Sequence, residues 1–165
     1  MRSLTGSLAL FAAGVGLGIF LMLPAAAQQN QNPGLRLNHV GIYAKDYDES
    51  MRFYTQTIGL REAFTIRDKD GKPTLTYLQI SKDTFLELAP ATAERPAGLS
   101  HIGIWPENLN GTVAALRQRG VKVDDPRTGS TKTSITNAID PNGVRLELLD
   151  FLPDSLPRKA MDEWK

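Results

Sequence analysis

The sequence predicts an α+β fold of two tandem repeats, each with the element order β-α-β-β-β. Two repeated stretches predict this duplication. His39-Val-Gly-Ile-Tyr43 recurs as His101-Ile-Gly-Ile-Trp105, and Phe85-Leu-Glu-Leu88 has its counterpart in Arg145-Leu-Glu-Leu148. The third observation is their spacing, because the glutamate follows the histidine of its own repeat after 48 residues (87 − 39) and 46 residues (147 − 101). Two segments of the same length with matching first and last strands indicate an internal repeat.

The first repeat, residues 35–90, is bounded by turn and cap residues. Residues 35–44 are predicted to form its first strand. Asp46 or Asp48 can cap the helix that follows, and Gly59 can end that helix. The other strands are predicted over residues 61–67, 74–80 and 84–88, which are rich in β-forming residues.

The second repeat, residues 98–150, is predicted to have the same order after a linker that contains two prolines. Its helix extends from about Asn108 to Arg119 and ends at Gly120. Its strands are predicted over residues 99–105, 121–124, 133–139 and 144–149. Residues 151–165 form a C-terminal tail that can add a short helix over the sheet, with Trp164 as a packing residue.

The first 27 residues are predicted to be a bacterial-type secretion signal. Arg2 gives a positive start, residues 8–23 are apolar, and Ala25-Ala26-Ala27 supplies a cleavage pattern. We therefore expect an exported protein, periplasmic or secreted, with residues 28–34 as an exposed lead-in and no membrane association after cleavage. The alternative is an uncleaved anchor, because the apolar run approaches the length of a membrane span.

Composition excludes several classes of function. The chain has no cysteine, so disulfides, thiolate ligands and thiol nucleophiles are excluded. Without Arg2 the mature chain has 18 basic and 18 acidic residues, and no basic stripe that would indicate nucleic-acid binding. The 138 residues after position 27 are enough for one compact domain.

One face of each opening strand has the composition of a site. Side chains alternate between the faces of a strand, so an imidazole, a glycine and an aromatic ring share one face in both repeats. In each closing strand the leucines take one face and leave the glutamate on the other. These residues are His39, Gly41 and Tyr43 with Glu87, and His101, Gly103 and Trp105 with Glu147.

The His-x-Gly-Ile-aromatic openings and the Asp-Pro-Asn-Gly turn before Arg-Leu-Glu-Leu resemble the vicinal oxygen chelate superfamily over residues 35–150. That superfamily includes glyoxalase I, the bleomycin-resistance proteins and the extradiol dioxygenases. The resemblance implies a cup-shaped mixed sheet with helices on its outer face and one divalent metal ion per site. The implied ligands are His39, Glu87, His101 and Glu147. Two imidazoles and two carboxylates suit Zn²⁺, Ni²⁺, Mn²⁺, Fe²⁺ or Co²⁺.

This ligand set resembles that of glyoxalase I most closely, which implies a metal-dependent lyase or isomerase. Such an enzyme moves a proton on a small substrate whose vicinal oxygens chelate the metal, with Glu87 or Glu147 as the base. Two positions depart from glyoxalase I: Tyr43 and Ala91 stand where that enzyme has an arginine and an asparagine that hold glutathione. We therefore expect a different small molecule as substrate.

Two other functions remain open at this point. One is an Fe²⁺-dependent extradiol-type dioxygenase, and the other is a binding protein without turnover, such as an antibiotic-binding protein. Tyr43 and Trp105 can line the mouth of the cup or pack in the core, and Arg145 can hold an anionic substrate group or pair with a carboxylate. Residues 127–131 are predicted to be a flexible loop that closes the cup. A homodimer is possible, and the cup can be closed within one chain or between two.

Overall fold

The computed structural model describes residues 34–165. The secretion signal predicted for residues 1–27, and all but the last residue of the lead-in predicted for 28–34, lie outside the described residues. Within the described part, no helix is long and apolar enough to cross a membrane.

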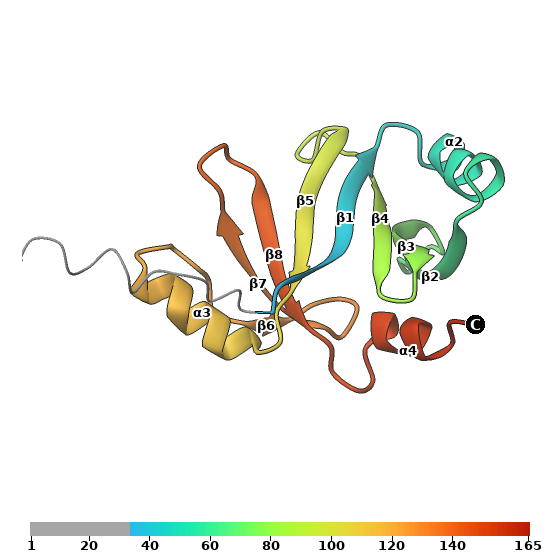
Figure 1. Cartoon of the computed structure of the whole chain (residues 1–165). Coiled ribbons are helices and arrows are strands. Elements are labelled where there is room, and N and C mark those ends of the chain that lie inside the picture. Colours follow the sequence, from blue (N-terminus) through green and yellow to red (C-terminus); the bar gives the residue numbers. More distant parts are fainter. Residues whose placement is uncertain (1–33) are drawn as a thin grey trace, which may run out of the picture. The chain divides into compact units, whose positions relative to one another are not determined.

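The described chain forms two successive sets of elements and a C-terminal helix (Figure 1). The first repeat comprises β1 (Arg36–Ala44), α2 (Tyr47–Arg52), the π-helical turn η2 (Phe53–Thr57), β2 (Arg61–Arg67), β3 (Pro73–Ser81) and β4 (Thr84–Pro90). The second repeat comprises β5 (Gly98–Trp105), α3 (Leu109–Gln118), β6 (Arg127–Thr128), β7 (Ser134–Ile139) and β8 (Arg145–Asp150). Helix α4 (Leu156–Asp162) follows. The predicted α+β class with two repeats is confirmed.

All eight strands belong to one mixed, curled sheet with the order β2-β3-β4-β1-β5-β8-β7-β6. Within each repeat the first strand pairs in parallel with the last, β1 with β4 and β5 with β8. The two repeats join where β1 pairs antiparallel with β5. The four strands predicted to carry the site therefore lie next to one another at the centre of the sheet, within a single chain (Figure 1).

Side-chain caps begin the two helices of the repeats. Helix α2 ends at Arg52 and continues as the π-helical turn η2 to Thr57, two residues before Gly59, where the helix was predicted to end. Asp46, one of the two candidates, caps α2, because its Oδ1 accepts from the Glu49 N–H at 2.9 Å. Asn108 caps α3 in the same way, at 2.9 Å from the Gly111 N–H. Gly120 follows α3 with a φ of 81°, a left-handed conformation that favours glycine.

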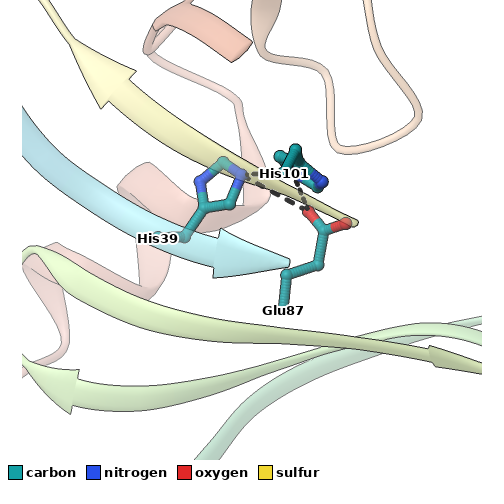
Figure 2. A group of neighbouring side chains, drawn as sticks. All are labelled: His39, Glu87 and His101. Atoms are coloured by element: carbon teal, nitrogen blue, oxygen red, sulfur yellow. Dashed lines mark hydrogen bonds and ion pairs between the residues drawn. The ribbon is translucent and has the colours of Figure 1, made fainter. Parts of the chain in front are cut away.

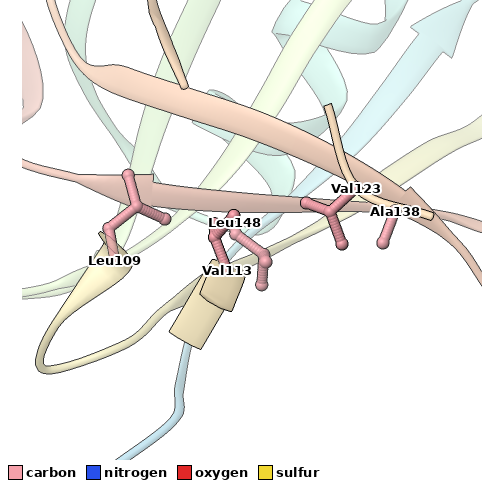
Figure 3. Close-up of a cluster of buried hydrophobic side chains, with 5 residues drawn as sticks. All are labelled: Leu109, Val113, Val123, Ala138 and Leu148. Carbon is pink, nitrogen blue, oxygen red and sulfur yellow. The ribbon is translucent and has the colours of Figure 1, made fainter. Parts of the chain in front are cut away.

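Two apolar clusters fix the two faces of the sheet. On one face, α3 packs against β8 through a cluster of Leu109, Val113, Val123, Ala138 and Leu148 (Figure 3). On the opposite face, the α4 residues Ala160 and Met161 pack against Tyr77 and Phe85. Because Phe85 and Glu87 alternate with leucines along β4, α4 covers part of the face that carries the glutamate. The C-terminal helix thus closes one end of the cup.

The edge of the second repeat differs from the prediction. Residues 121–124 form a single bridge, from Val123 to Ala138, in place of a strand. The Arg117 side chain donates to the Val123 carbonyl at 2.9 and 3.2 Å, which keeps that carbonyl out of a strand ladder. The edge strand is instead β6, inside the segment predicted to be a flexible loop. That segment is also tied to α4, because the Leu156 N–H donates to the Thr131 carbonyl at 3.0 Å.

Candidate metal centre

The antiparallel pairing of β1 with β5 explains the repeated His-x-Gly pattern. In this register His39 lies opposite Gly103, and His101 lies opposite Gly41. Each imidazole occupies the space above the glycine of the other repeat. A Cβ atom at Gly41 would overlap the His101 ring, and one at Gly103 would overlap the His39 ring. The two glycines are therefore what allows both imidazoles to turn inward at the same point of the sheet.

Three donor groups converge at this point (Figure 2). The Nε2 atoms of His39 and His101 are 2.8 Å apart, and Glu87 Oε2 is 3.7 Å from each of them. Their donor atoms all lie within 4.8 Å of one another. Ligands about 2.1 Å from a transition metal are roughly 3 to 4 Å apart, so two nitrogens and one oxygen at these distances fit a divalent ion.

Glu147, the fourth predicted ligand, lies beside this group. Its Oε1 is 3.6 Å from His39 Nε2 and its Oε2 is 3.5 Å from Arg145 Nη1. It is not a member of the group whose donor atoms all lie within 4.8 Å of one another. The structure therefore brings all four predicted ligands together. Glu147 differs from Glu87 because its neighbours are one imidazole and an arginine, whereas Glu87 faces both imidazoles.

His39 is oriented for metal binding by its sequence neighbour. Its Nδ1 is 2.9 Å from Asn38 Oδ1, while the amide nitrogen of Asn38 donates to the Asp83 carbonyl at 2.7 Å. The amide oxygen can only accept, so His39 Nδ1 carries the proton. The Nε2 lone pair therefore points at the centre of the group, which is how a ligating histidine is held.

His101 has the opposite arrangement. Arg145 Nη2 is 2.8 Å from His101 Nδ1, and a guanidinium only donates, so this Nδ1 accepts. The proton of the neutral ring is then on Nε2, directed at His39. Metal binding at Nε2 requires the proton on Nδ1, where Ser100 Oγ, 3.0 Å away, can accept it. Arg145 must turn away from His101 for this to happen.

Burial determines the charges of the group. Burial, together with the neighbouring His101 and Arg145, lowers the pKa of His39 to about 3. Burial and Arg145 lower the pKa of His101 to about 3 as well. Burial also raises the pKa of Glu87 to about 7, against a hydrogen bond from Tyr77 that lowers it. Two neutral imidazoles and a carboxylate that ionises near neutral pH form a site that a cation stabilises.

A cavity of about 420 Å³ opens above the group. Among the predicted substrate-binding residues, Tyr43 and Arg145 line this cavity together with His101, Glu87 and Glu147. Trp105 is not among the lining residues that the structure describes. It lies where β5 meets the start of β1, with its ring 4.7 Å from that of Phe151 and beneath the Arg36 guanidinium at 3.9 Å.

The sequence analysis did not identify Tyr77 or Arg95 as cavity residues, and it named Arg127 only as part of the loop predicted to close the cup. Tyr77 lies directly opposite Glu87 on the neighbouring strand β3, and Arg95 and Arg127 line the mouth. Side chains alternate along β3, so Leu75, Tyr77 and Gln79 share one face. The register of β3 with β4 would have been needed to predict that Tyr77 lies beside Glu87. Arg95 lies in the proline-containing linker and Arg127 lies in the β6 segment. Neither segment has a periodic pattern that predicts where its side chains point.

The sheet of two repeats and the comparison with protein families indicate the same superfamily. Residues 36–148 match the Glyoxalase/Bleomycin resistance protein/Dioxygenase superfamily. This chain belongs to that superfamily, as the resemblance implied.

Individual relatives are distant in sequence. A probable chloroplastic lactoylglutathione lyase of Arabidopsis thaliana is 29% identical over 137 residues, which are 77% of this chain but only 39% of that protein. A probable lactoylglutathione lyase of Vibrio parahaemolyticus is 27% identical over 69% of this chain and 89% of its own length. The methylmalonyl-CoA epimerase of Streptomyces coelicolor, solved with 2-nitronate-propionyl-CoA, superimposes with a TM-score of 0.61 at 28% identity. That alignment covers 73% of this chain and 96% of the epimerase. The relatives named for an activity are thus a lyase and an epimerase.

Proposed function

We propose that this protein is a divalent-metal-dependent lyase or isomerase of the glyoxalase I type. In this proposal it moves a proton on a small substrate with vicinal oxygens. The observation that carries the proposal is the convergence of two neutral imidazoles and two carboxylates, in which Glu87 faces both imidazoles and Glu147 faces one imidazole and Arg145. His39, Glu87 and His101 would hold the ion, and Glu147 would remain available for proton transfer.

A bound divalent ion would act as a Lewis acid and stabilise negative charge on the substrate oxygens that it chelates. Glu147 would remove the proton from the neighbouring carbon, and the electron pair would pass to the oxygen side of the substrate. The same carboxyl group would return the proton to the adjacent carbon, which completes an isomerisation.

Glu147 is suited to both halves of this exchange. Burial raises its pKa, which brings a carboxylic acid toward the range in which it can accept and return a proton at neutral pH, although Arg145 opposes the shift. Its Oε2 lies 3.5 Å from Arg145 Nη1 and its Oε1 lies 3.6 Å from His39 Nε2. Glu87 differs because it faces both imidazoles at 3.7 Å and would be occupied by the ion.

The substrate is proposed to differ from the glutathione hemithioacetal of glyoxalase I. Tyr43 lines the cavity where glyoxalase I has an arginine that holds glutathione. Export of the protein, which is proposed from residues 1–27 alone, would also separate it from intracellular glutathione.

The test uses residues 28–165 loaded in turn with Zn²⁺, Ni²⁺, Mn²⁺, Co²⁺ and Fe²⁺. Substrate candidates are the methylglyoxal–glutathione hemithioacetal, methylmalonyl-CoA and simple 2-hydroxyketones and 2-hydroxyacids in D₂O, with loss of the C–H signal followed by proton NMR. We expect metal-dependent exchange with at least one candidate. Glu147→Gln should keep about one metal ion per chain and lose exchange by roughly 10²- to 10⁴-fold. Absence of exchange with every metal and candidate would refute the proposal.

A second candidate function is an Fe²⁺-dependent dioxygenase. The observation in its favour is that the group of three comprises two histidines and one carboxylate, the set typical of non-haem iron oxygenases. An oxygen electrode separates the two functions. Oxygen uptake by the Fe²⁺-loaded protein with catechol, without uptake by the Zn²⁺-loaded protein, would support the dioxygenase.

A further inference from the structure

Three guanidinium groups surround the mouth of the cavity, and the proposed metal chemistry does not use them. Arg145 comes from β8, Arg127 from β6 and Arg95 from the linker between the repeats. They lie far apart in the sequence, and the curled sheet brings them to one opening. Such a convergence of three like charges is unfavourable unless something negative compensates it.

The surrounding carboxylates do not compensate these arginines. Arg95 and Arg127 form no ion pair with any carboxylate in residues 34–165, and the only carboxylate in these residues that pairs with Arg145 is Glu147. The acidic residues lining the cavity are Glu87 and Glu147. With a divalent ion bound and both glutamates ionised, three arginines leave the cavity with a formal charge of +3. An aqueous cleft of this kind attracts anions.

The accumulation of arginine is particular to this cavity. A neighbouring cleft of about 490 Å³ shares Arg95 and Thr74 with it, but its other charged lining residues are three aspartates and one lysine: Asp46, Asp48, Asp68 and Lys72. Of these two neighbouring clefts, only the cup, which contains the proposed metal ligands, has more basic than acidic lining residues. Arg95 marks the boundary between a basic and an acidic region.

The arginines are also positioned to form hydrogen bonds with a bound anion. Arg145 already reaches the metal group, with Nη2 2.8 Å from His101 Nδ1, and metal binding at His101 Nε2 would require it to turn away from that atom. Arg127 and Arg95 are exposed at the rim, where Arg95 lies over the Tyr43 ring at 5.4 Å. Guanidinium groups bind carboxylate and phosphate in a bidentate geometry.

We propose that the substrate carries a carboxylate or phosphate group in addition to the two oxygens that chelate the metal. The chelating pair would lie over His39, Glu87 and His101, and the anionic group would lie among the three arginines. This inference rests on the proposed function, because it assumes a substrate that chelates the metal.

Three hydroxamates that share one chelating group test the proposal. Acetohydroxamate has no further charge, malonohydroxamate adds a carboxylate, and phosphonoacetohydroxamate adds a phosphonate. Each is titrated by calorimetry into Zn²⁺-loaded residues 28–165, with the metal content measured before and after. We expect at least one of the two anionic compounds to bind about tenfold more tightly than acetohydroxamate, the factor that one charge-assisted contact contributes. Which of the two gains more identifies the anionic group.

Matched variants assign the effect to the arginines. Arg127→Gln and Arg95→Gln should each reduce the preference for the anionic compounds by roughly three- to tenfold and leave the Kd of acetohydroxamate unchanged. Arg119→Gln, which removes an exposed arginine after α3, should change neither. Equal binding of the three hydroxamates, or a preference that survives both variants, would overturn the proposal.

The outcome is independent of turnover, so a protein that fails to exchange protons can still show the preference. A protein that loads no metal would refute the proposed function instead. In that case malonate and inorganic phosphate are titrated into the unloaded protein. Binding that is lost in Arg127→Gln would support the anion site, and absence of binding would overturn it.

Discussion

Arg145→Gln should increase the affinity of the protein for a divalent metal, although it removes a polar side chain from the site. Two effects act in the same direction. The guanidinium holds His101 in the form with its proton on Nε2, the atom that must bind the metal. It also places a positive charge beside the ion. Glutamine is neutral, and its amide oxygen can accept a proton from His101 Nδ1.

The electrostatic part can be estimated from the geometry. Arg145 Nη2 is 2.8 Å from His101 Nδ1. A metal at Nε2 across the ring, at about 2.0–2.1 Å, would be roughly 6 to 7 Å from the guanidinium in the position that Arg145 has here, before it turns away. At that distance one charge repels a divalent ion by about 1.3 kcal/mol at a dielectric constant of about 80, and by about 5 kcal/mol at about 20. Because Arg145 is 31% exposed, we take the lower figure, which corresponds to about a tenfold tighter Kd.

The assay is competition for Zn²⁺ against a fluorescent chelator at pH 7.5 and low ionic strength, with thermal unfolding as a check that both variants are folded. Arg145→Lys is the matched control. Lysine keeps the charge and can only donate, so its Kd should stay close to that of the parent. The reasoning is refuted if Arg145→Gln binds Zn²⁺ no more tightly than the parent, or if Arg145→Lys binds it as tightly as Arg145→Gln.

Three further outcomes are expected. Metal affinity should be nearly constant above pH 7 and fall by about tenfold per pH unit below it. The reason is that Glu87, with a pKa of about 7, must lose its proton to bind the metal. Chelator competition between pH 5.5 and 8.5 measures this dependence. Gly41→Ala and Gly103→Ala should each lower the free energy of unfolding, measured in urea, by about 1–3 kcal/mol and should also lower the metal content. The reason is that the new Cβ overlaps the imidazole on the opposite strand. An unchanged metal content would contradict this expectation. Expression of the full chain in a bacterial host should yield a secreted or periplasmic protein whose first residue by mass spectrometry is Gln28, whereas an intact N-terminus in the membrane fraction would indicate the uncleaved anchor.

The order of elements could be predicted because each is bounded by a local signal. The Asn108 cap and Gly120 delimit α3, and alternation within β1 and β5 assigned His39 and His101 to one face. These signals depend on neighbouring residues only. The fold class followed from them, because two repeats with the same order of elements must be joined edge to edge or face to face to bury their apolar sides.

The parts that were missed depend on contacts between distant residues. Val123 has the composition of a strand residue, but Arg117 takes its carbonyl, so the edge strand forms at Arg127 instead. The position of Trp105 depends on the direction of pairing. In an antiparallel pair, equivalent residues of the two repeats lie at opposite ends, so Tyr43 lies at the mouth and Trp105 at the far end. Sequence similarity between repeats does not give this direction.

The same antiparallel pairing makes the site asymmetric, and the asymmetry bears on its chemistry. The repeats supply equivalent histidines, but the residues before them differ. The Asn38 side chain accepts a hydrogen bond from His39 Nδ1, whereas Ser100 Oγ and Arg145 Nη2 both lie within hydrogen-bond distance of His101 Nδ1. His39 is therefore held in its ligating tautomer at all times. His101 reaches that tautomer only when Arg145 turns away, which is also the movement that would free Arg145 for an anionic substrate. Metal binding and anion binding would then favour each other, because both require the same displacement of one side chain.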